Sequence, residues 1–117
     1  MIKNKSVLAI IPARKGSKRL VGKNMLDLKG QPLIAWTIEE ALKSKYIDNI
    51  IISTDDQNII NLSKQYKGIN VPFVRPKELS SDKATSLDVV LHALSYYSSN
   101  DKNFDYVMLL QPTSPLR

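Results

Sequence analysis

Near the N-terminus of this 117-residue chain, residues 6–13 form an almost uninterrupted apolar run, SVLAIIPA. A short run of this kind is typical of a β-strand that is covered on both of its faces. Such strands occur in parallel sheets, because the crossover connections place helices on both sides of the sheet. A buried parallel sheet is therefore the architecture that the sequence predicts first.

Further apolar segments follow the first one and alternate with helical patterns. Strands are predicted at residues 50–53, 71–74 and 106–110, and Pro72 indicates an edge position or a strand start for the second of these. Strands that alternate with helices define an α/β fold with right-handed crossovers. We therefore expect a mostly parallel sheet of about four strands with flanking helices.

Three helices are expected between these strands. The first opens at Pro32, and the second follows the capping candidates Thr54, Asp55 and Asp56 and stops near Gly68. The third helix has an apolar stripe at helical spacing. The residues expected to share one face are Ile34, Ile38, Ala41, Leu42 and Lys45 in the first helix, Ile59, Leu62, Ser63 and Tyr66 in the second, and Leu87, Val90, Leu91, Leu94 and Tyr97 in the third.

A polar segment follows each predicted strand, at residues 14–24, 53–56, 75–86 and 111–117. In open parallel sheets, ligands bind beyond the carboxyl ends of the strands. We therefore predict that these four segments line one rim of the sheet, and that this rim holds the functional site.

The positive charge of the chain is concentrated in the first of these segments. The net charge is +6, yet residues 1–30 carry eight Lys or Arg and a single acid, whereas the remainder carries nine Lys or Arg and ten acids. Such a focused cluster favours a small polyanion over a long nucleic acid. Because neither GxxxxGK[ST] nor GxGxxG is present, spacing alone leaves both a phosphate site and a solvated basic loop open.

Two function classes are excluded by composition. No apolar run approaches the roughly 20 residues that a membrane-spanning helix needs. The chain contains no Cys, which excludes disulfides and thiolate metal sites and suits a cytoplasmic protein.

Four motifs together resemble one known family. The segments IPARKGSKRLVGKN, STDD, RPKELSSDKATS and LQPTSPLR occur in this order and closely resemble the acylneuraminate cytidylyltransferases, the CMP-sialic acid synthetases. The resemblance covers the whole chain and implies a Rossmann-like nucleotide-diphospho-sugar transferase fold. It also implies that residues 1–117 form the N-terminal part of a single domain that is truncated at its C-terminus.

The resemblance further implies an activity. Enzymes of this family use CTP and the anomeric hydroxyl of a nonulosonic (sialic-type) acid to form a CMP-sugar and pyrophosphate, with Mg²⁺ as cofactor. The CMP-KDO synthetases share the strand-and-loop opening and are the nearest alternative. A non-catalytic module that binds a nucleotide or another anion is the second alternative.

Site residues are carried over by motif. The resemblance implies that Arg14, Ser17 and Lys23 contact the triphosphate, with Arg14 and Lys23 acting in catalysis, and that Asn24 holds the ribose or base. Arg75, Ala84 through its main chain, and Ser86 resemble the positions that recognise cytosine and place the nucleotide, while Gln111 resembles the residue that binds the acceptor sugar.

Several of these positions have a structural interpretation as well. Asp55 and Asp56 are candidate metal ligands, but a helix cap followed by helical residues is favoured, and Asp82 is a candidate cap for the third helix. The resemblance places the Mg²⁺-binding aspartates beyond Arg117, so no metal ligand is expected within the chain. We therefore expect the 117-residue chain to be weak or inactive alone, and the full-length protein to be a cytoplasmic homodimer.

Overall fold

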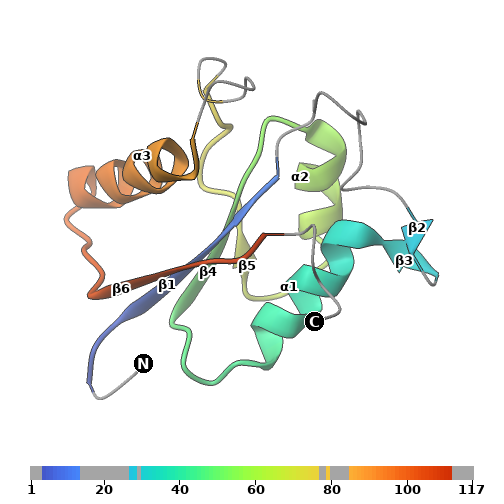
Figure 1. The fold of residues 1–117 in the computed structure, drawn as a ribbon, viewed down its shortest axis with the longest axis horizontal. Coiled ribbons are helices and arrows are strands. Elements are labelled where there is room, and N and C mark those ends of the chain that lie inside the picture. The colour runs from blue at the N-terminus through green and yellow to red at the C-terminus, as the bar shows by residue number, and fades with distance from the viewer. Residues whose placement is uncertain (1–3, 14–26, 29, 77–78, 80–84, 112–117) are drawn as a thin grey trace.

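The computed structural model describes residues 4–13, 27–28, 30–76, 79 and 85–111. In chain order the elements are β1 (Val7–Pro12), β2 (Asp27–Leu28), β3 (Gln31–Pro32), α1 (Leu33–Lys43), β4 (Asn49–Ser53), α2 (Gln57–Ser63), β5 (Ile69–Asn70), α3 (Ser86–Ser99) and β6 (Tyr106–Leu109). The main sheet has the strand order β5-β4-β1-β6, and all of its pairs are parallel. Figure 1 shows α3 on one side of this sheet and α1 and α2 on the other. The predicted α/β architecture is confirmed.

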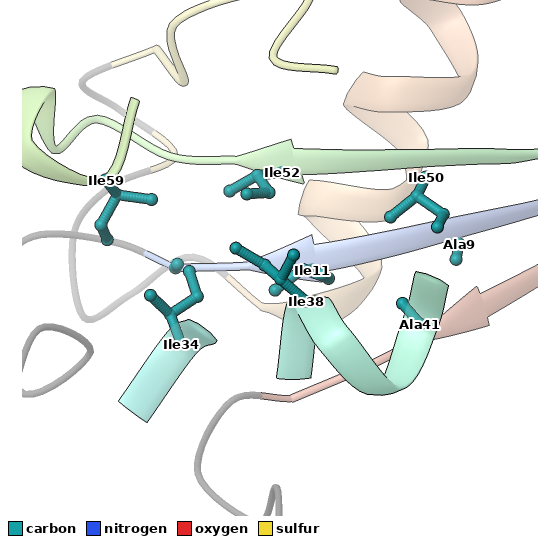
Figure 2. Close-up of a cluster of buried hydrophobic side chains, with 9 residues drawn as sticks. Ala9, Ile11, Ile34, Ile38, Ala41, Ile50, Ile52 and Ile59 are labelled. Carbon is teal, nitrogen blue, oxygen red and sulfur yellow. The ribbon is translucent and has the colours of Figure 1, made fainter. Parts of the chain in front are cut away.

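Strand β1 lies inside the sheet and explains the apolar run. Every residue from Val7 to Ile11 is fully buried, because β1 pairs with β4 on one side and with β6 on the other. Successive side chains of a strand point to opposite faces, so Ala9 and Ile11 pack toward α1 and α2, while Leu8 and Ile10 pack toward α3. Figure 2 shows the first of these two clusters.

The strand predicted at residues 71–74 is placed differently in the structure. The paired strand β5 is Ile69–Asn70, and Val74 forms only an isolated bridge with Thr54. Pro72 lies between them and has no N–H to donate to a ladder, which accounts for the interruption. The predicted edge position is confirmed, since β5 is the outermost strand next to β4.

Helix α3 turns a different face to the sheet than its sequence stripe predicted. Val89 and Ala93 are buried, whereas Leu87 and Leu91 are 64% and 55% exposed, so the prediction was wrong for these two leucines. On one flank of the helix, His92 and Tyr96 pack against Phe73, with ring centroids 4.5 and 5.2 Å away. This contact and the close approach allowed by Ala93 rotate the leucines to the opposite flank.

The other members of the stripe agree with the prediction. Val90, Leu94 and Tyr97 pack against the cluster formed by Leu8, Ile10 and Ile51. In the first helix, Ile34, Ile38 and Ala41 are buried as predicted, but the prediction was wrong for Leu42, which is 38% exposed, and for Lys45, which is exposed and lies beyond the helix end at Lys43. In the second helix, Ile59 and Ser63 are buried as predicted. Gly68 has a φ of +96°, a conformation that favours glycine, and it lies a few residues beyond the end of α2.

Two aspartates fix the start of β1. The backbone N–H of Val7 donates to Asp48 Oδ2 at 2.7 Å, and the N–H of Ser6 donates to Asp105 Oδ2 at 2.8 Å. The segments that precede β4 and β6 therefore hold β1 in its place between these two strands. The hydrogen bond from Val7 lowers the pKa of the Asp48 carboxyl below its ordinary value of 3.8.

Replacing Asp48 by asparagine is expected to lower stability at neutral pH and to matter little in acid. A carboxyl whose pKa is lowered by folding stabilises the fold above its unfolded-state pKa, and this contribution is lost as the pH falls through the folded-state pKa. Urea unfolding of Asp48→Asn and the wild-type chain should therefore converge as the pH falls below 3.8 and through the lowered folded-state pKa of Asp48. Glu40→Gln, at an exposed ion pair with Lys43, is the control and should change stability little at any pH.

Candidate functional site

The carboxyl ends of the strands meet at one edge, as the sequence predicted. Because β1, β4 and β6 are mutually parallel, Ala13, Ser53 and Leu110 all lie at this rim. The N–H of Ala13 donates to the carbonyl of Ser53 at 2.9 Å, and the N–H of Leu110 donates to the carbonyl of Ile10 at 2.9 Å. The predicted site residues Arg14, Ser17, Lys23, Asn24 and Ala84 lie outside the described residues, and Arg75, Ser86 and Gln111 lie within them.

Ser53 and Thr54 organise the centre of the rim. Both are fully buried, which requires their hydroxyls to find partners inside the protein. The hydroxyl of Thr54 donates to the carbonyl of Ala13 and accepts the N–H of Asp56, the latter at 2.9 Å. These bonds hold the end of β1, from which the basic segment 14–24 continues in the sequence, against the end of β4.

Arg75 lies at the same place, and its side chain is only 5% exposed. Its Nε donates to Ser53 Oγ at 3.1 Å and its Nη2 donates to the Ser53 carbonyl at 2.7 Å. Its Nη1 donates to the carbonyl of Leu79 at 3.3 Å, and its backbone N–H to the carbonyl of Thr54 at 2.8 Å. Burying a guanidinium costs free energy unless its N–H groups find acceptors. The acceptors supplied by Ser53 and Leu79 therefore allow Arg75 to be buried at this position.

Ser86 and Gln111, which are 25 residues apart, come together at the rim. Gln111 Nε2 donates to Ser86 Oγ at 3.4 Å, and both residues are exposed. Ser86 is the first residue of α3, and Gln111 follows β6. One residue expected to place the nucleotide thus contacts the residue expected to bind the acceptor sugar.

The cap of α3 is Thr85 and not Asp82, so the predicted cap was wrong. Asp88 N–H donates to Thr85 Oγ1 at 3.1 Å, and Thr85 N–H donates to Asp88 Oδ2 at 3.0 Å. These two bonds form a capping box, in which Thr85 and Asp88 satisfy each other's backbone N–H, and a helix cannot have a second cap upstream. Asp82 itself lies outside the described residues.

The acidic pair after β4 was favoured as a helix start, and Asp56 confirms this. Its carboxylate accepts the N–H of Asn58 at 2.9 Å and caps α2. Among the residues that the structure describes, no group of three or more His, Asp or Glu side chains is placed to hold a metal ion. The described part therefore offers no ligand set for the Mg²⁺ that the resemblance implies.

The roles of Ser53 and Thr54 were not predicted from the sequence. Residues 53–56 were expected to be a polar segment of the rim with capping side chains, and neither hydroxyl had a predicted partner. Two adjacent hydroxyl residues at the end of an apolar strand were the available signal, since buried hydroxyls must be hydrogen-bonded. Their partners are 41 and 22 residues away in the sequence, and periodicity does not reveal such pairings.

A parallel α/β sheet with polar segments gathered at its carboxyl edge is the architecture of nucleotide-binding enzymes. Comparison with known proteins identifies the class more closely. A family model described as "Cytidylyltransferase" matches residues 8–116. The chain therefore belongs to the cytidylyltransferase family, and the resemblance stated from its motifs is confirmed.

Curated relatives cover almost all of this chain. A CMP-N,N'-diacetyllegionaminic acid synthase of Legionella pneumophila is 47% identical over 111 residues, which are 95% of this chain and 47% of that protein. A pseudaminic acid cytidylyltransferase of Campylobacter jejuni is 46% identical over 93% of this chain and 47% of that protein. An N-acylneuraminate cytidylyltransferase of Escherichia coli is 44% identical over 95% of this chain and 25% of that protein. The chain thus spans less than half the length of these relatives.

Solved structures support the same fold. A CMP:2-keto-3-deoxy-manno-octonic acid synthetase complexed with CTP matches with a TM-score of 0.75 and 25% identity, over 97% of this chain and 42% of that one. A cytidylyltransferase from Leptospira borgpetersenii matches with a TM-score of 0.68 and 23% identity, over 96% of this chain and 43% of that one. The Rossmann-like fold expected from the motifs is therefore confirmed. Within the described residues, no helix is long and apolar enough to cross a membrane.

Proposed function

We propose that this chain is the CTP-binding part of a cytidylyltransferase that activates a nonulosonic acid, with CMP-sugar and pyrophosphate as products. The observation that carries the proposal is the 44–47% identity to three relatives named for such acids, each over more than nine-tenths of this chain. The rim formed by Ala13, Ser53, Arg75 and Gln111 supports it, because this is the edge at which such a sheet binds its ligand.

The roles of the site residues follow from the charge that develops in the reaction. The anomeric hydroxyl of the sugar acid gives up its proton to water, its oxygen forms a bond to the α-phosphorus, and the bond from that phosphorus to the pyrophosphate oxygen breaks. Arg14 and Lys23 would neutralise the growing negative charge, and Ser17 would hydrogen-bond the triphosphate. Asn24, Arg75, Ala84 and Ser86 would hold the cytidine, and Gln111 would bind the acceptor.

The location, the cofactor and the oligomeric state of the full-length protein belong to the same proposal and rest on the resemblance alone. We expect a cytoplasmic enzyme that uses Mg²⁺ and forms a homodimer in its full-length form. We expect the 117-residue chain to bind CTP but to form CMP-sugar weakly or not at all alone, because it spans less than half of its relatives. Robust product formation by the purified chain would contradict that expectation.

Calorimetric titration of the chain with CTP, ATP and pyrophosphate tests the proposal. CTP is expected to bind at least about tenfold more tightly than ATP, because the polar groups that pair with cytosine are left unpaired by adenine. Equal affinity for all three ligands would support a generic anion-binding loop instead. Binding to DNA or RNA that falls steeply with salt would place the chain in a third class.

A CMP-KDO synthetase-like activity is the second candidate, and the structural match to the CTP-bound synthetase favours it. Both activities would use the same nucleotide site, so the acceptor decides between them. In the same calorimeter, the CTP-loaded chain should bind a nonulosonic acid in preference to KDO. Preference for KDO would favour this second candidate.

A further inference from the structure

The start of α3 is held by two reciprocal hydrogen bonds between Thr85 and Asp88. The N–H of Asp88 donates to Thr85 Oγ1 at 3.1 Å, and the N–H of Thr85 donates to Asp88 Oδ2 at 3.0 Å. The carbonyl of Thr85 also accepts the N–H of Val89, at 3.2 Å. Ser86 lies between the two partners in the sequence, so this capping box fixes its backbone and the direction in which its side chain departs.

Gln111 is placed by a different part of the fold. The N–H of the preceding residue, Leu110, donates to the carbonyl of Ile10 at 2.9 Å, which ties the end of β6 to the central strand β1. From this position Gln111 Nε2 donates to Ser86 Oγ at 3.4 Å. The contact between Ser86 and Gln111 therefore depends on the helix start on one side and on the sheet on the other.

Asp88 carries a negative charge two residues beyond Ser86, close to the proposed site of an anionic nucleotide. Charge alone would make Asp88 unfavourable for CTP, because like charges repel each other. Its carboxylate, however, accepts the N–H of Thr85 and thereby supports the helix start. The two effects have opposite signs. Repulsion predicts that removing the Asp88 side chain strengthens CTP binding, whereas a positioning role predicts that it weakens CTP binding.

We propose that Thr85 and Asp88 are positioning residues of the nucleotide site: their capping box holds Ser86 where its hydroxyl meets both the cytidine and the side-chain amide of Gln111. Thr85 and Asp88 act on the nucleotide through Ser86 and do not contact it themselves. This inference rests on the proposed function, in which Ser86 holds the cytidine. All four residues belong to the continuous stretch 85–111, and no motif assignment gives Thr85 or Asp88 a role.

Calorimetry with CTP and with pyrophosphate tests the capping box in Thr85→Ala, Asp88→Ala and the double variant. Each single substitution is expected to weaken CTP binding about threefold to tenfold, which is the size of effect that losing a helix cap produces. Pyrophosphate has no nucleoside, so its affinity should not fall. The double variant should be little weaker than either single variant, since both substitutions break the same capping box.

Conservative variants should restore CTP binding. Thr85→Ser keeps a hydroxyl at the cap, and Asp88→Glu keeps a carboxylate three residues later, which together are the general pattern of a capping box. Each of these variants should bind CTP within about twofold of the wild-type affinity. Rescue by both variants would show that the hydrogen bonds matter and not the particular side chains.

Asp48→Asn is the matched control. It also removes a negative charge and weakens a carboxylate that accepts a backbone N–H, that of Val7 at 2.7 Å, but Asp48 directly precedes β4 and so lies at the edge of the sheet opposite the rim. Its CTP affinity should equal that of the wild type. A spectroscopic readout needs no ligand: in NMR correlation spectra, the side-chain amide signals of Gln111 should shift in Thr85→Ala and Asp88→Ala but not in Asp48→Asn.

The outcomes separate this inference from the proposed function. If the wild-type chain binds CTP selectively and Asp88→Ala binds it as tightly or more tightly, the positioning role is wrong. The inference also fails if CTP and pyrophosphate affinities fall by the same factor, which would indicate general destabilisation, or if the Gln111 signals do not shift. If the wild-type chain does not prefer CTP over ATP, the proposed function itself fails, and this inference fails with it.

Discussion

Replacing Arg14 or Lys23 by alanine is expected to weaken CTP binding to this chain by about tenfold to 100-fold. A hydrogen bond between a charged donor and a phosphate contributes about 1.5–3 kcal/mol, and each substitution removes one such partner from the proposed triphosphate site. Calorimetry at two salt concentrations checks the result. The affinity of the wild-type chain should fall more steeply with salt than that of either variant, because the wild type makes more charged contacts.

Lys43→Ala is the matched control for this prediction. It removes the same unit of charge, but Lys43 ends α1, just before β4 begins, and so lies toward the edge of the sheet opposite the rim. CTP affinity should change less than about twofold, since an exposed charge at that distance is screened. An equal loss in all three variants would mean that CTP responds only to net charge, and the phosphate site at residues 14–23 would then be wrong.

The parallel sheet was predictable because the apolar run of β1 fits only a strand in the interior of a sheet. Five consecutive residues, 7–11, are fully buried, which a strand achieves only when both faces and both edges are covered. A continuous apolar run carries this information directly. By contrast, the register of β5 depends on where Pro72 interrupts the ladder, and the sequence shows the proline but not the two residues that pair before it.

The face of α3 was less predictable for a physical reason. Helical periodicity shows which residues share a face, but α3 carries apolar residues around more than half of its circumference. The choice between faces is made by its neighbours: Phe73 packs against His92 and Tyr96 on one flank, and small Ala93 lets the helix approach the sheet. Neither contact is encoded in the spacing of the leucines.

In the candidate site, too, features of neighbouring residues were predictable, whereas contacts between residues distant in the sequence were not. The polar segments after the strands predicted the rim, because parallel strands all end at one edge. The contact between Ser86 and Gln111, and the bonds from Arg75 to Ser53, join residues that are 25 and 22 positions apart. The motifs identified Ser86, Gln111 and Arg75 separately, but only the fold shows which of them touch.

The second large effect is expected in the core, where Ile51→Ala should lower the free energy of unfolding by about 3–4 kcal/mol. Ile51 is fully buried in β4, pairs with Ile10 and packs toward Val89 and Ala93 of α3. The substitution removes three carbon atoms and leaves a cavity. Because β4 is paired on both of its edges, the surrounding residues cannot move far enough to fill that cavity. Urea unfolding with linear extrapolation measures the change, and the midpoint should fall while the slope stays constant.

Leu87→Ala is the control for Ile51→Ala, because it tests which face of α3 packs against the sheet. It removes the same number of carbon atoms, and the sequence stripe placed Leu87 against the sheet, whereas the structure leaves it 64% exposed. The structure therefore predicts a loss below about 0.5 kcal/mol for Leu87→Ala. A loss close to that of Ile51→Ala would mean that α3 presents the face its sequence stripe indicates. Because Ser86 begins the same helix, such a rotation would also separate its hydroxyl from Gln111 and dismantle that part of the proposed site.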